Sequence, residues 1–201
     1  MAALASAGLY VALPPSLRVG PPWLLPATVL LLLIPTVALR YRELHTWNQR
    51  FGYLLLSVLT VALLGSLGLL IAGLPSHKES PAALLRSATA LWISNILVFA
   101  SWYWRLDAGG PNQRDLRGEH IDGAFLFPQM TMSNEAKEAA GERNWRPGFV
   151  DYLFLAFNSS TAFSPTDAPV LSRWAKLMMM IQSSISLATL ALLAARAVNI
   201  L

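Results

Sequence analysis

The stretch FVDYLFLAFNSSTAFSPTDAPV, Phe149 to Val170, decides the fold. Its apolar part, Phe149 to Phe157, has nine residues, whereas a helix needs about 20 to cross a bilayer. Polar residues follow at positions 158–161, and Pro165 and Pro169 then interrupt any helical pattern. An apolar segment of this length is typical of a re-entrant helix, which enters the membrane without crossing it. The alternative is an amphipathic helix that lies on the membrane surface.

Long apolar runs on both sides of this stretch predict membrane spans. Hydrophobic residues make up 55% of the 201-residue chain and charged residues only 13%, and the mean hydropathy is +0.48. Such a chain has too few charges to cover a water-exposed surface, so we expect a single all-α membrane domain over residues 1–201. The expected elements are four transmembrane helices at about residues 23–39, 52–73, 82–104 and 171–198, with a re-entrant half-helix segment at 149–167 before the last span.

The one long polar stretch is residues 107–148, which holds five Lys/Arg and seven Asp/Glu. We expect it to be mostly loop, with a short surface helix over Asn134 to Arg143 that Ser133 or Asn134 caps. The N-terminal residues carry no charge before Arg18. A cleaved signal peptide is therefore not expected, because its apolar core follows a basic region.

Motifs in the second half of the chain resemble a known family. The third span ends in SWYWRLD, a loop contains FLFP, and WRPGFVDYLFLAF, STAFSPTDAPVLSRW and ALLAARAVN follow in that order. Over roughly residues 100–200 this order resembles a family of small bacterial integral membrane proteins known only as a domain of unknown function. The resemblance rests on Asp151, Phe157, Asp167, Ser172-Arg173 and Val198-Asn199. It implies a multi-pass protein of the bacterial inner membrane.

The order of helix, re-entrant segment and helix is more remotely similar to the pore module of potassium channels. That similarity matches Phe149–Ser160 to the pore helix and the last span to the inner helix. The filter-like residues it implies are Thr161, Ala162, Phe163, Ser164, Pro165, Thr166 and Asp167. A potassium filter uses glycines for its backbone dihedrals, and this segment has none, so the filter is degenerate and potassium selectivity is not implied.

A polar stripe is predicted on the last span. Gln182, Ser186, Thr189 and Arg196 are spaced by four, three and seven residues, which puts them along one side of a helix. Polar side chains avoid lipid, so we expect the stripe to face the bundle or water. One interpretation is the lining of a pore or pathway, and the other is hydrogen bonding between packed helices. Asn95 in the third span is expected to hydrogen-bond to a neighbouring helix.

No pattern of catalytic or metal-ligating residues is present. The chain has no cysteine, and His45, His77 and His120 share no metal-ligand spacing. Nucleophile elbows, phosphate loops and zincin motifs are also absent from the sequence. We therefore expect no enzyme, no cofactor and no metal site. The net charge of +4 is explained by basic residues that flank spans, so nucleic acid is not an expected partner.

The predicted function is passive conduction of an ion or small solute by a homo-oligomer in the lipid bilayer. The alternative is a non-conducting scaffold or accessory subunit, and a secondary transporter comes third because the chain has no inverted repeat. The orientation stays open. Eleven of the 15 Lys/Arg lie on the side of the long loop, which favours a cytoplasmic loop. A channel-like module would instead have its re-entrant segment outside.

Overall fold

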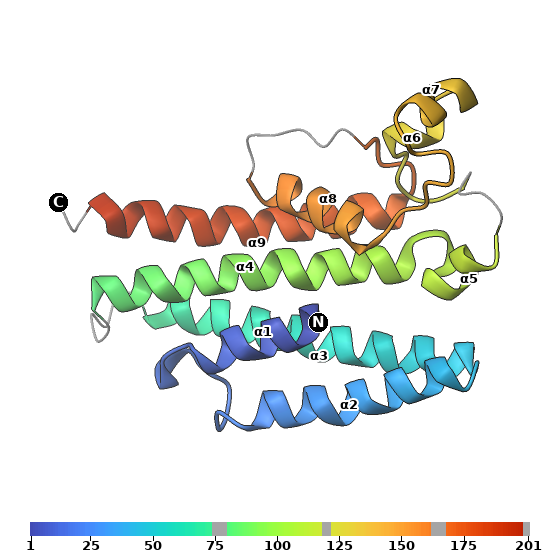
Figure 1. Cartoon of the computed structure of the whole chain (residues 1–201). Helices are drawn as coiled ribbons and strands as arrows, with labels where there is room; N and C mark the ends of the chain where they lie inside the picture. The colour runs from blue at the N-terminus through green and yellow to red at the C-terminus, as the bar shows by residue number, and fades with distance from the viewer. Residues whose placement is uncertain (74–79, 118–121, 162–167, 199–201) are drawn as a thin grey trace.

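The computed structural model describes residues 1–73, 80–117, 122–161 and 168–198. Within them, four helices are long and apolar enough to cross a membrane. They are α2 (Leu24–Tyr41), α3 (His45–Gly73), α4 (Pro81–Leu106) and α9 (Arg173–Val198) (Figure 1). These described residues form no strand, only one isolated bridge between Phe125 and Val170. The chain is therefore an all-α, multi-pass membrane protein, as its composition predicts.

Three of the four long helices begin and end within two residues of the predicted positions. The second is longer, because α3 begins at His45 and not at about residue 52. The prediction began the helix at about residue 52, after the polar stretch that ends at Arg50. A helix satisfies its own backbone hydrogen bonds and needs no lipid around it, so residues 45–51, most of which are polar, continue α3 beyond the apolar run.

A tight turn joins α2 to α3. Glu43 has a φ of 57°, in the left-handed region, and its N–H donates to the Arg40 carbonyl at 3.2 Å. The N–H of Leu44 donates to the Leu39 carbonyl at 3.1 Å. Together these bonds form a Schellman C-cap, in which glycine is the usual residue at the position of Glu43. The turn thus reverses the chain while it satisfies two terminal carbonyls of α2.

A short apolar helix, α1 (Ala2–Val11), precedes the first span and was not predicted. It buries Ser6, Ala7 and Tyr10 against the bundle. The Tyr10 hydroxyl donates to the Val19 carbonyl at 2.9 Å and accepts from the Val19 N–H at 2.7 Å. These two bonds fasten the connection between α1 and α2. An isolated ten-residue helix is marginal, so its stability comes from this packing.

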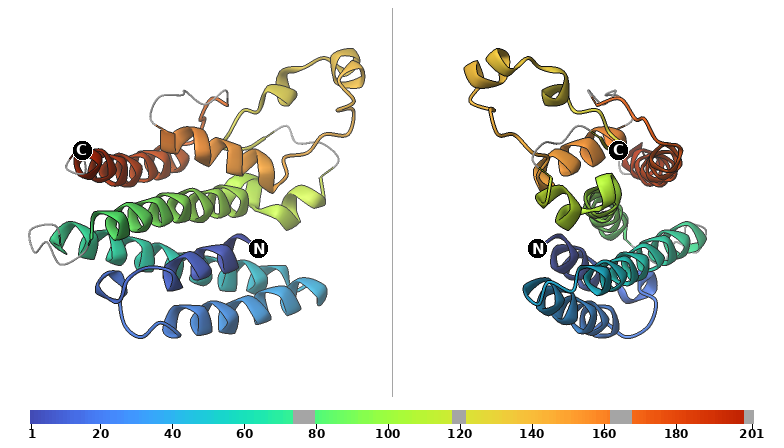
Figure 2. Two further views of the ribbon diagram at one scale, coloured as in Figure 1. Left: turned by 60° about the vertical axis from the view of Figure 1, so that its left-hand side comes forward. Right: turned by 90° about the vertical axis from the view of Figure 1, so that its right-hand side faces the viewer.

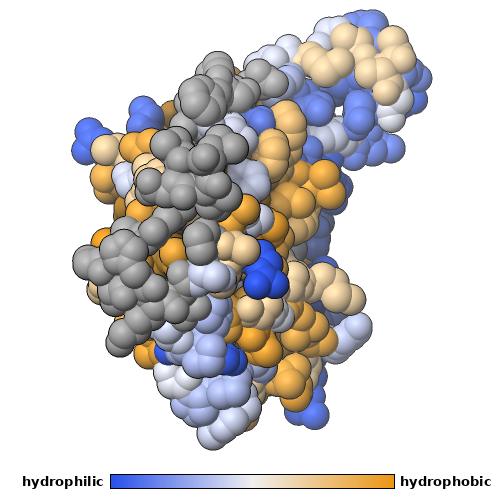
Figure 3. All heavy atoms as spheres, turned by 90° about the vertical axis from the view of Figure 1, so that its left-hand side faces the viewer, coloured by the Kyte–Doolittle hydropathy of each residue, from blue (hydrophilic) through white to orange (hydrophobic). Residues whose placement is uncertain are grey.

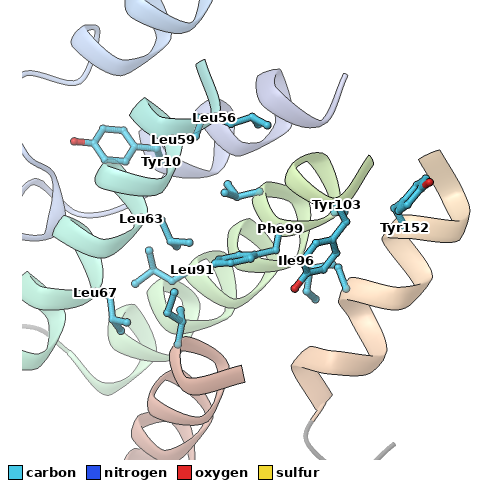
Figure 4. Close-up of a cluster of buried hydrophobic side chains, with 14 of the residues drawn as sticks. Tyr10, Leu56, Leu59, Leu63, Leu67, Leu91, Ile96, Phe99, Tyr103 and Tyr152 are labelled. Atoms are coloured by element: carbon cyan, nitrogen blue, oxygen red, sulfur yellow. The ribbon is translucent and has the colours of Figure 1, made fainter. Parts of the chain in front are cut away.

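The central helix of the bundle is α4. In Figures 1 and 2 it lies between α8 (Phe149–Thr161) and α9 on one side and α1 to α3 on the other, and it contacts α1, α3, α8 and α9. Figure 4 shows Leu63 of α3 beside Leu91 and Phe99 of α4, all of them buried. Any element that is to be held inside this protein is therefore held mainly against α4.

The outside of the bundle is apolar. Large hydrophobic side chains that are more than 60% exposed occur on α2, α3 and α9; they include Leu31, Ile34, Val61, Met180 and Leu187. Figure 3 shows hydrophobic residues that reach the surface of the bundle. A soluble monomer rarely exposes so much contiguous apolar surface, whereas lipid tails cover it without penalty.

Where the structure describes it, the polar stretch 107–148 is mostly loop, with a 3-10 turn at its start and the short helices α5 (Pro111–Asp115), α6 (Pro128–Thr131) and α7 (Asn134–Ala139). The predicted surface helix is α7, and it ends at Ala139 and not at Arg143. Its cap is Ser133, whose Oγ accepts from the Ala136 N–H at 3.2 Å. The chain leaves the helical conformation at Gly141, which has a φ of 74°.

The left-handed conformation of Glu43 leads to a stability prediction. Glu43→Gly removes the Cβ that disfavours this φ, so we expect the free energy of unfolding to rise by about 0.5–1 kcal/mol. The control Glu43→Ala also removes the carboxylate but keeps a Cβ, and it should give no such gain. Thermal unfolding of the purified protein in detergent measures both variants. Equal effects of the two substitutions would show that the gain does not come from the backbone.

Candidate functional site

The short helix α8 enters the bundle and ends inside it. Its 13 residues span about 20 Å, against about 30 Å for the hydrocarbon core. It begins beside the end of α4, where the rings of Phe149 and Trp104 lie 6.1 Å apart. It ends at Thr161, beside residues near the middle of the 26-residue helices α4 and α9. The predicted apolar helix over Phe149 to Phe157 is confirmed, and it continues through Ser160 to Thr161.

The start of α8 is set by an acidic cap. Asp151 lies in the first turn, and its Oδ2 accepts from the Gly148 N–H at 2.7 Å. A carboxylate at this end also complements the positive N-terminus of the helix. One face of α8, with Tyr152, Leu155 and Ala156, is buried in the core. The opposite face stays exposed, so α8 is held from one side.

The carbonyls at the end of α8 accept hydrogen bonds from side chains of α9 and α4. Ser186 Oγ donates to the Ser160 carbonyl at 2.7 Å, and Trp92 Nε1 donates to the same oxygen at 3.3 Å. Ser183 Oγ donates to the Ser159 carbonyl at 3.1 Å. The last carbonyls of a helix have no partner within the helix, and each one left unsatisfied in hydrocarbon costs several kcal/mol. These donors therefore allow α8 to end inside the bundle.

Gln182 of α9 is the centre of this polar cluster. Its side-chain Nε2 donates to the Ala156 carbonyl and to Ser160 Oγ, both at 2.7 Å. Its Oε1 accepts from the Tyr103 hydroxyl at 2.5 Å, and its backbone carbonyl accepts from Asn95 Nδ2 at 3.1 Å. Gln182 is 0% exposed. One amide thus joins α4, α8 and α9, and the expected bond from Asn95 to a neighbouring helix is present.

The predicted polar stripe faces the inside of the chain. Gln182, Ser186 and Thr189 are all fully buried. Thr189 Oγ1 donates to the Ile185 carbonyl of its own helix at 2.7 Å, while the other two bind α8. Arg196 lies on α9, but its side chain is outside the described part of the structure. These contacts are the ones that the packing interpretation of the stripe expects.

Only the first of the predicted filter-like residues falls within the described part of the chain. Thr161 is the last residue of α8, and its Oγ1 donates to the Asn158 carbonyl at 2.9 Å. The others lie outside the described residues; they are Ala162, Phe163, Ser164, Pro165, Thr166 and Asp167.

The chain resumes at the end of the bundle where α8 began. The Leu126 N–H donates to the Pro169 carbonyl at 2.9 Å, and the Leu171 N–H donates to the Ala124 carbonyl at 2.8 Å. Phe125 lies between these bonds, and its ring is 6.2 Å from that of Tyr152 in α8 and 6.1 Å from that of Trp174 in α9. The starts of α8 and α9 therefore meet the same loop, and α8 does not cross the membrane.

A buried cluster at the start of α8 escaped the sequence analysis. Tyr152 donates through its hydroxyl to Asp107 Oδ2 at 2.6 Å, and the Ala124 N–H donates to Asp107 Oδ1 at 2.5 Å. Arg114 Nη1 donates to the Asp107 carbonyl at 2.7 Å, and its guanidinium lies 5.1 Å from the Tyr152 ring centre. Burial and the neighbouring Asp107 raise the pKa of the Tyr152 phenol far above its ordinary value, so the phenol stays a donor.

The sequence places Asp107 at the start of a polar stretch that is mostly loop, but the structure buries it completely, with 0% of the residue exposed. The available signal was its position directly after the aromatic cluster SWYWRL at the end of a span. A carboxylate at this position is either solvated or buried together with hydrogen-bond donors. Which of the two occurs depends on the tertiary structure. The hydrogen bonds of Asp107 connect the end of α4 to the start of α8 and to the loop at Ala124.

A small cavity runs beside α8 on the side of α6. Its volume is about 120 Å³. Its polar lining is Asp151 near the start of α8, Asn158 near the end, and Gln129 of α6, and its walls include Phe154 and Leu155. The cavity therefore extends from the Asp151 carboxylate, near the start of α8, to the Asn158 amide, which lies deeper in the bundle.

In the described part of the chain, no group of three or more His, Asp or Glu side chains is placed to hold a metal ion. His77 and His120 lie outside that part. Comparison with protein-family models, curated proteins and solved structures finds no match to this chain.

The position of Gln182 leads to a stability prediction. Gln182→Leu keeps the size of the side chain and removes three hydrogen bonds, so we expect the free energy of unfolding to fall by about 2–5 kcal/mol, at roughly 0.6–1.7 kcal/mol for each interhelical bond. The control is Ser184→Ala on the exposed face of α9, where the hydroxyl only donates to the Met180 carbonyl. Unfolding in mixed micelles measures both. A Gln182→Leu variant as stable as the control would contradict the role of Gln182 in holding α8.

Proposed function

We propose that the protein is a channel-like membrane protein that passively conducts an ion or small solute as a homo-oligomer. The observation that carries the proposal is a half-helix, α8, that ends near the middle of α4 and α9. Non-helical backbone at membrane depth is tolerated where it is buried in protein or lines water. Half-helices of this kind direct their ends at ions or solutes in channels and transporters.

The charge pattern around α8 favours a cation. The C-terminal end of a helix carries about half a negative charge, and here that end points into the bundle. The cavity beside α8 adds the Asp151 carboxylate and the amides of Gln129 and Asn158. Carboxylate and amide oxygens are suitable partners for a cation that moves along this face.

A path for the solute needs more than one copy of the chain. Gln182, Ser186 and Thr189 of the polar stripe are occupied by hydrogen bonds inside the chain, so these three side chains offer no free groups to a pathway. The opposite face of α9 is exposed and apolar, with Leu177, Ile181 and Leu187, and carries the smaller Ser184 and Ala191 among them. In the proposal this face meets α9 of other copies, and the exposed side of α8 borders the path.

The second candidate is a non-conducting scaffold or accessory subunit. One observation favours it: four carbonyls near the end of α8, those of Ala156 and residues 158–160, all accept hydrogen bonds within one chain. A short helix that only fills the interior of the bundle, and lines no path, would make the same contacts. A secondary transporter has no such support. For both candidates the resemblance to a bacterial family supports an inner-membrane location, and neither role is enzymatic.

Flux measurements on Asn158→Leu test the proposal. The purified protein is reconstituted in liposomes, and the efflux of cations and anions is followed after a gradient is applied. Asn158→Leu replaces the amide in the cavity by an apolar group of similar size, so we expect cation flux to fall at least about tenfold. The matched control is Phe154→Leu, which changes an apolar wall of the same cavity and should keep the flux. Oligomer size should be the same in all three proteins.

Asp151→Asn completes the test, because it keeps the shape of the side chain and removes its charge. It should lower the preference for cations over anions. A parent protein that passes neither cations nor anions would remove the channel proposal and favour the scaffold. If both Asn158→Leu and Asp151→Asn have the same flux and selectivity as a conducting parent protein, the conduction path does not follow α8.

A further inference from the structure

Arg105 is a buried cation on the central helix. It lies one residue before the end of α4 and is 9% exposed. It faces α3, where it donates to Asn48, and it lines a cavity together with Thr36 of α2. A guanidinium has five N–H donors and stays charged, so its burial is costly unless an anion or several acceptors surround it.

Asn48 and Gly52 of α3 fix the position of this guanidinium. Its Nη1 donates to the Asn48 carbonyl at 3.1 Å and to Asn48 Oδ1 at 3.3 Å. Asn48 is itself fixed, because its Nδ2 donates to the Thr36 carbonyl of α2 at 2.5 Å. Opposite the guanidinium stands Gly52 of α3, where a Cβ would collide with the Arg105 side chain. The absence of a side chain at Gly52 is thus what makes room for the charge.

The guanidinium has no anionic partner among the described residues. Its hydrogen bonds to these residues are those from Nη1, and no carboxylate in this part of the chain lies within ion-pair distance of it. The Nε and Nη2 donors therefore have no protein acceptor there. Arginine forks of this kind match the geometry of a phosphate or carboxylate, which accepts two parallel bonds.

Arg105 lines a cavity with the chemistry of an amphipathic anion site. The cavity has a volume of about 360 Å³ and is lined by residues of α2, α3 and α4, together with residues 1–3 at the N-terminus and Phe149 of α8. Apart from the guanidinium and two hydroxyls, from Thr36 and Ser101, its walls are mainly apolar side chains, among them Leu33, Leu55, Leu56, Trp104 and Phe149. One end of the site is thus charged, and the rest excludes water.

We propose that this cavity binds a phospholipid. Arg105 donates from Nε and Nη2 to the phosphate, and an acyl chain lies against the leucines of α2 and α3. The level in the membrane is consistent, because Arg105 lies beside Trp102 and Trp104 at the end of a span, where headgroups meet aromatic residues. The site does not involve the exposed face of α8. The proposal of a lipid site is therefore the same whether the protein is a channel or a scaffold.

A free phosphate ion has the same anionic group but no use for the apolar walls. The experiment therefore compares three additions to delipidated wild-type protein in detergent: phosphatidylglycerol, inorganic phosphate, and diacylglycerol, which has the chains without the phosphate. We expect phosphatidylglycerol to raise Tm by about 5 °C or more at saturation, through binding to the folded state. Neither of the other additions should do so. An equal shift with inorganic phosphate or with diacylglycerol would overturn the proposal of a phospholipid.

Variants assign the shift to this site. Arg105→Gln and Gly52→Ala should both lose it, the first by removal of the charge and the second by displacement of the guanidinium. The control Arg50→Gln removes an exposed arginine near the same end of α3, which lies over the Trp47 ring, and should keep the shift. If Arg105→Gln or Gly52→Ala retains the full phosphatidylglycerol shift, the proposal is wrong.

A second measurement does not depend on the folding of those variants. Phosphatidylglycerol with brominated acyl chains quenches tryptophan fluorescence on contact, and Trp104 lines the cavity. We expect at least a twofold smaller loss of fluorescence in Trp104→Phe than in the wild type at the same stoichiometric lipid. Trp23 is an exposed tryptophan away from the cavity, so Trp23→Phe serves as the control and should quench like the wild type. Equal quenching in wild type and Trp104→Phe would overturn the position of the acyl chain.

Discussion

The hydrogen bonds from Gln182, Ser183 and Ser186 to the end of α8 are the interaction on which the rest of the structure depends. A helix that stops in hydrocarbon leaves several carbonyls without partners, and lipid offers no donor. This chain supplies the donors from the middle of α9 and from Trp92 of α4. The polar residues of α9 are therefore needed because α8 is short.

Two polar clusters hold α8 at its two ends. At the start of α8, the Tyr152 hydroxyl donates a hydrogen bond to Asp107. Asp107 also accepts a hydrogen bond from the Ala124 N–H in the loop. At the inner end, Gln182 joins the last turn of α8 to Tyr103 and Asn95 of α4. Because α4 contributes to both clusters, the position of α8 is set by the central helix of the bundle. The end of α8 at Thr161 is thereby held near the middle of α4 and α9.

Much of this architecture was predictable from the sequence, because bilayer thickness is a strong constraint. Nine apolar residues between two polar stretches cannot span, so the half-helix followed from Phe149 to Phe157 alone. The buried face of Gln182 and Ser186 followed from helical spacing and the cost of polar groups in lipid. The start of α3 at His45 did not follow, because helices continue outside the apolar run on which span prediction depends. Asp107 was missed because a carboxylate next to a span is solvated or buried according to contacts with Tyr152 and Ala124, which are distant in sequence.

The depth of α8 in a bilayer tests the central claim most directly. The chain has no cysteine, so single cysteines at Val150, Phe154, Phe157 and Leu171 can be spin-labelled and their depth measured against oxygen and a water-soluble relaxant. All four side chains are exposed on the outside of the chain. The account predicts that depth increases from Val150 through Phe154 to Phe157, and that Leu171 is shallow and labelled by an impermeant thiol reagent from the same side as Val150. A constant shallow depth along α8, or labelling of Leu171 from the opposite side, would contradict it.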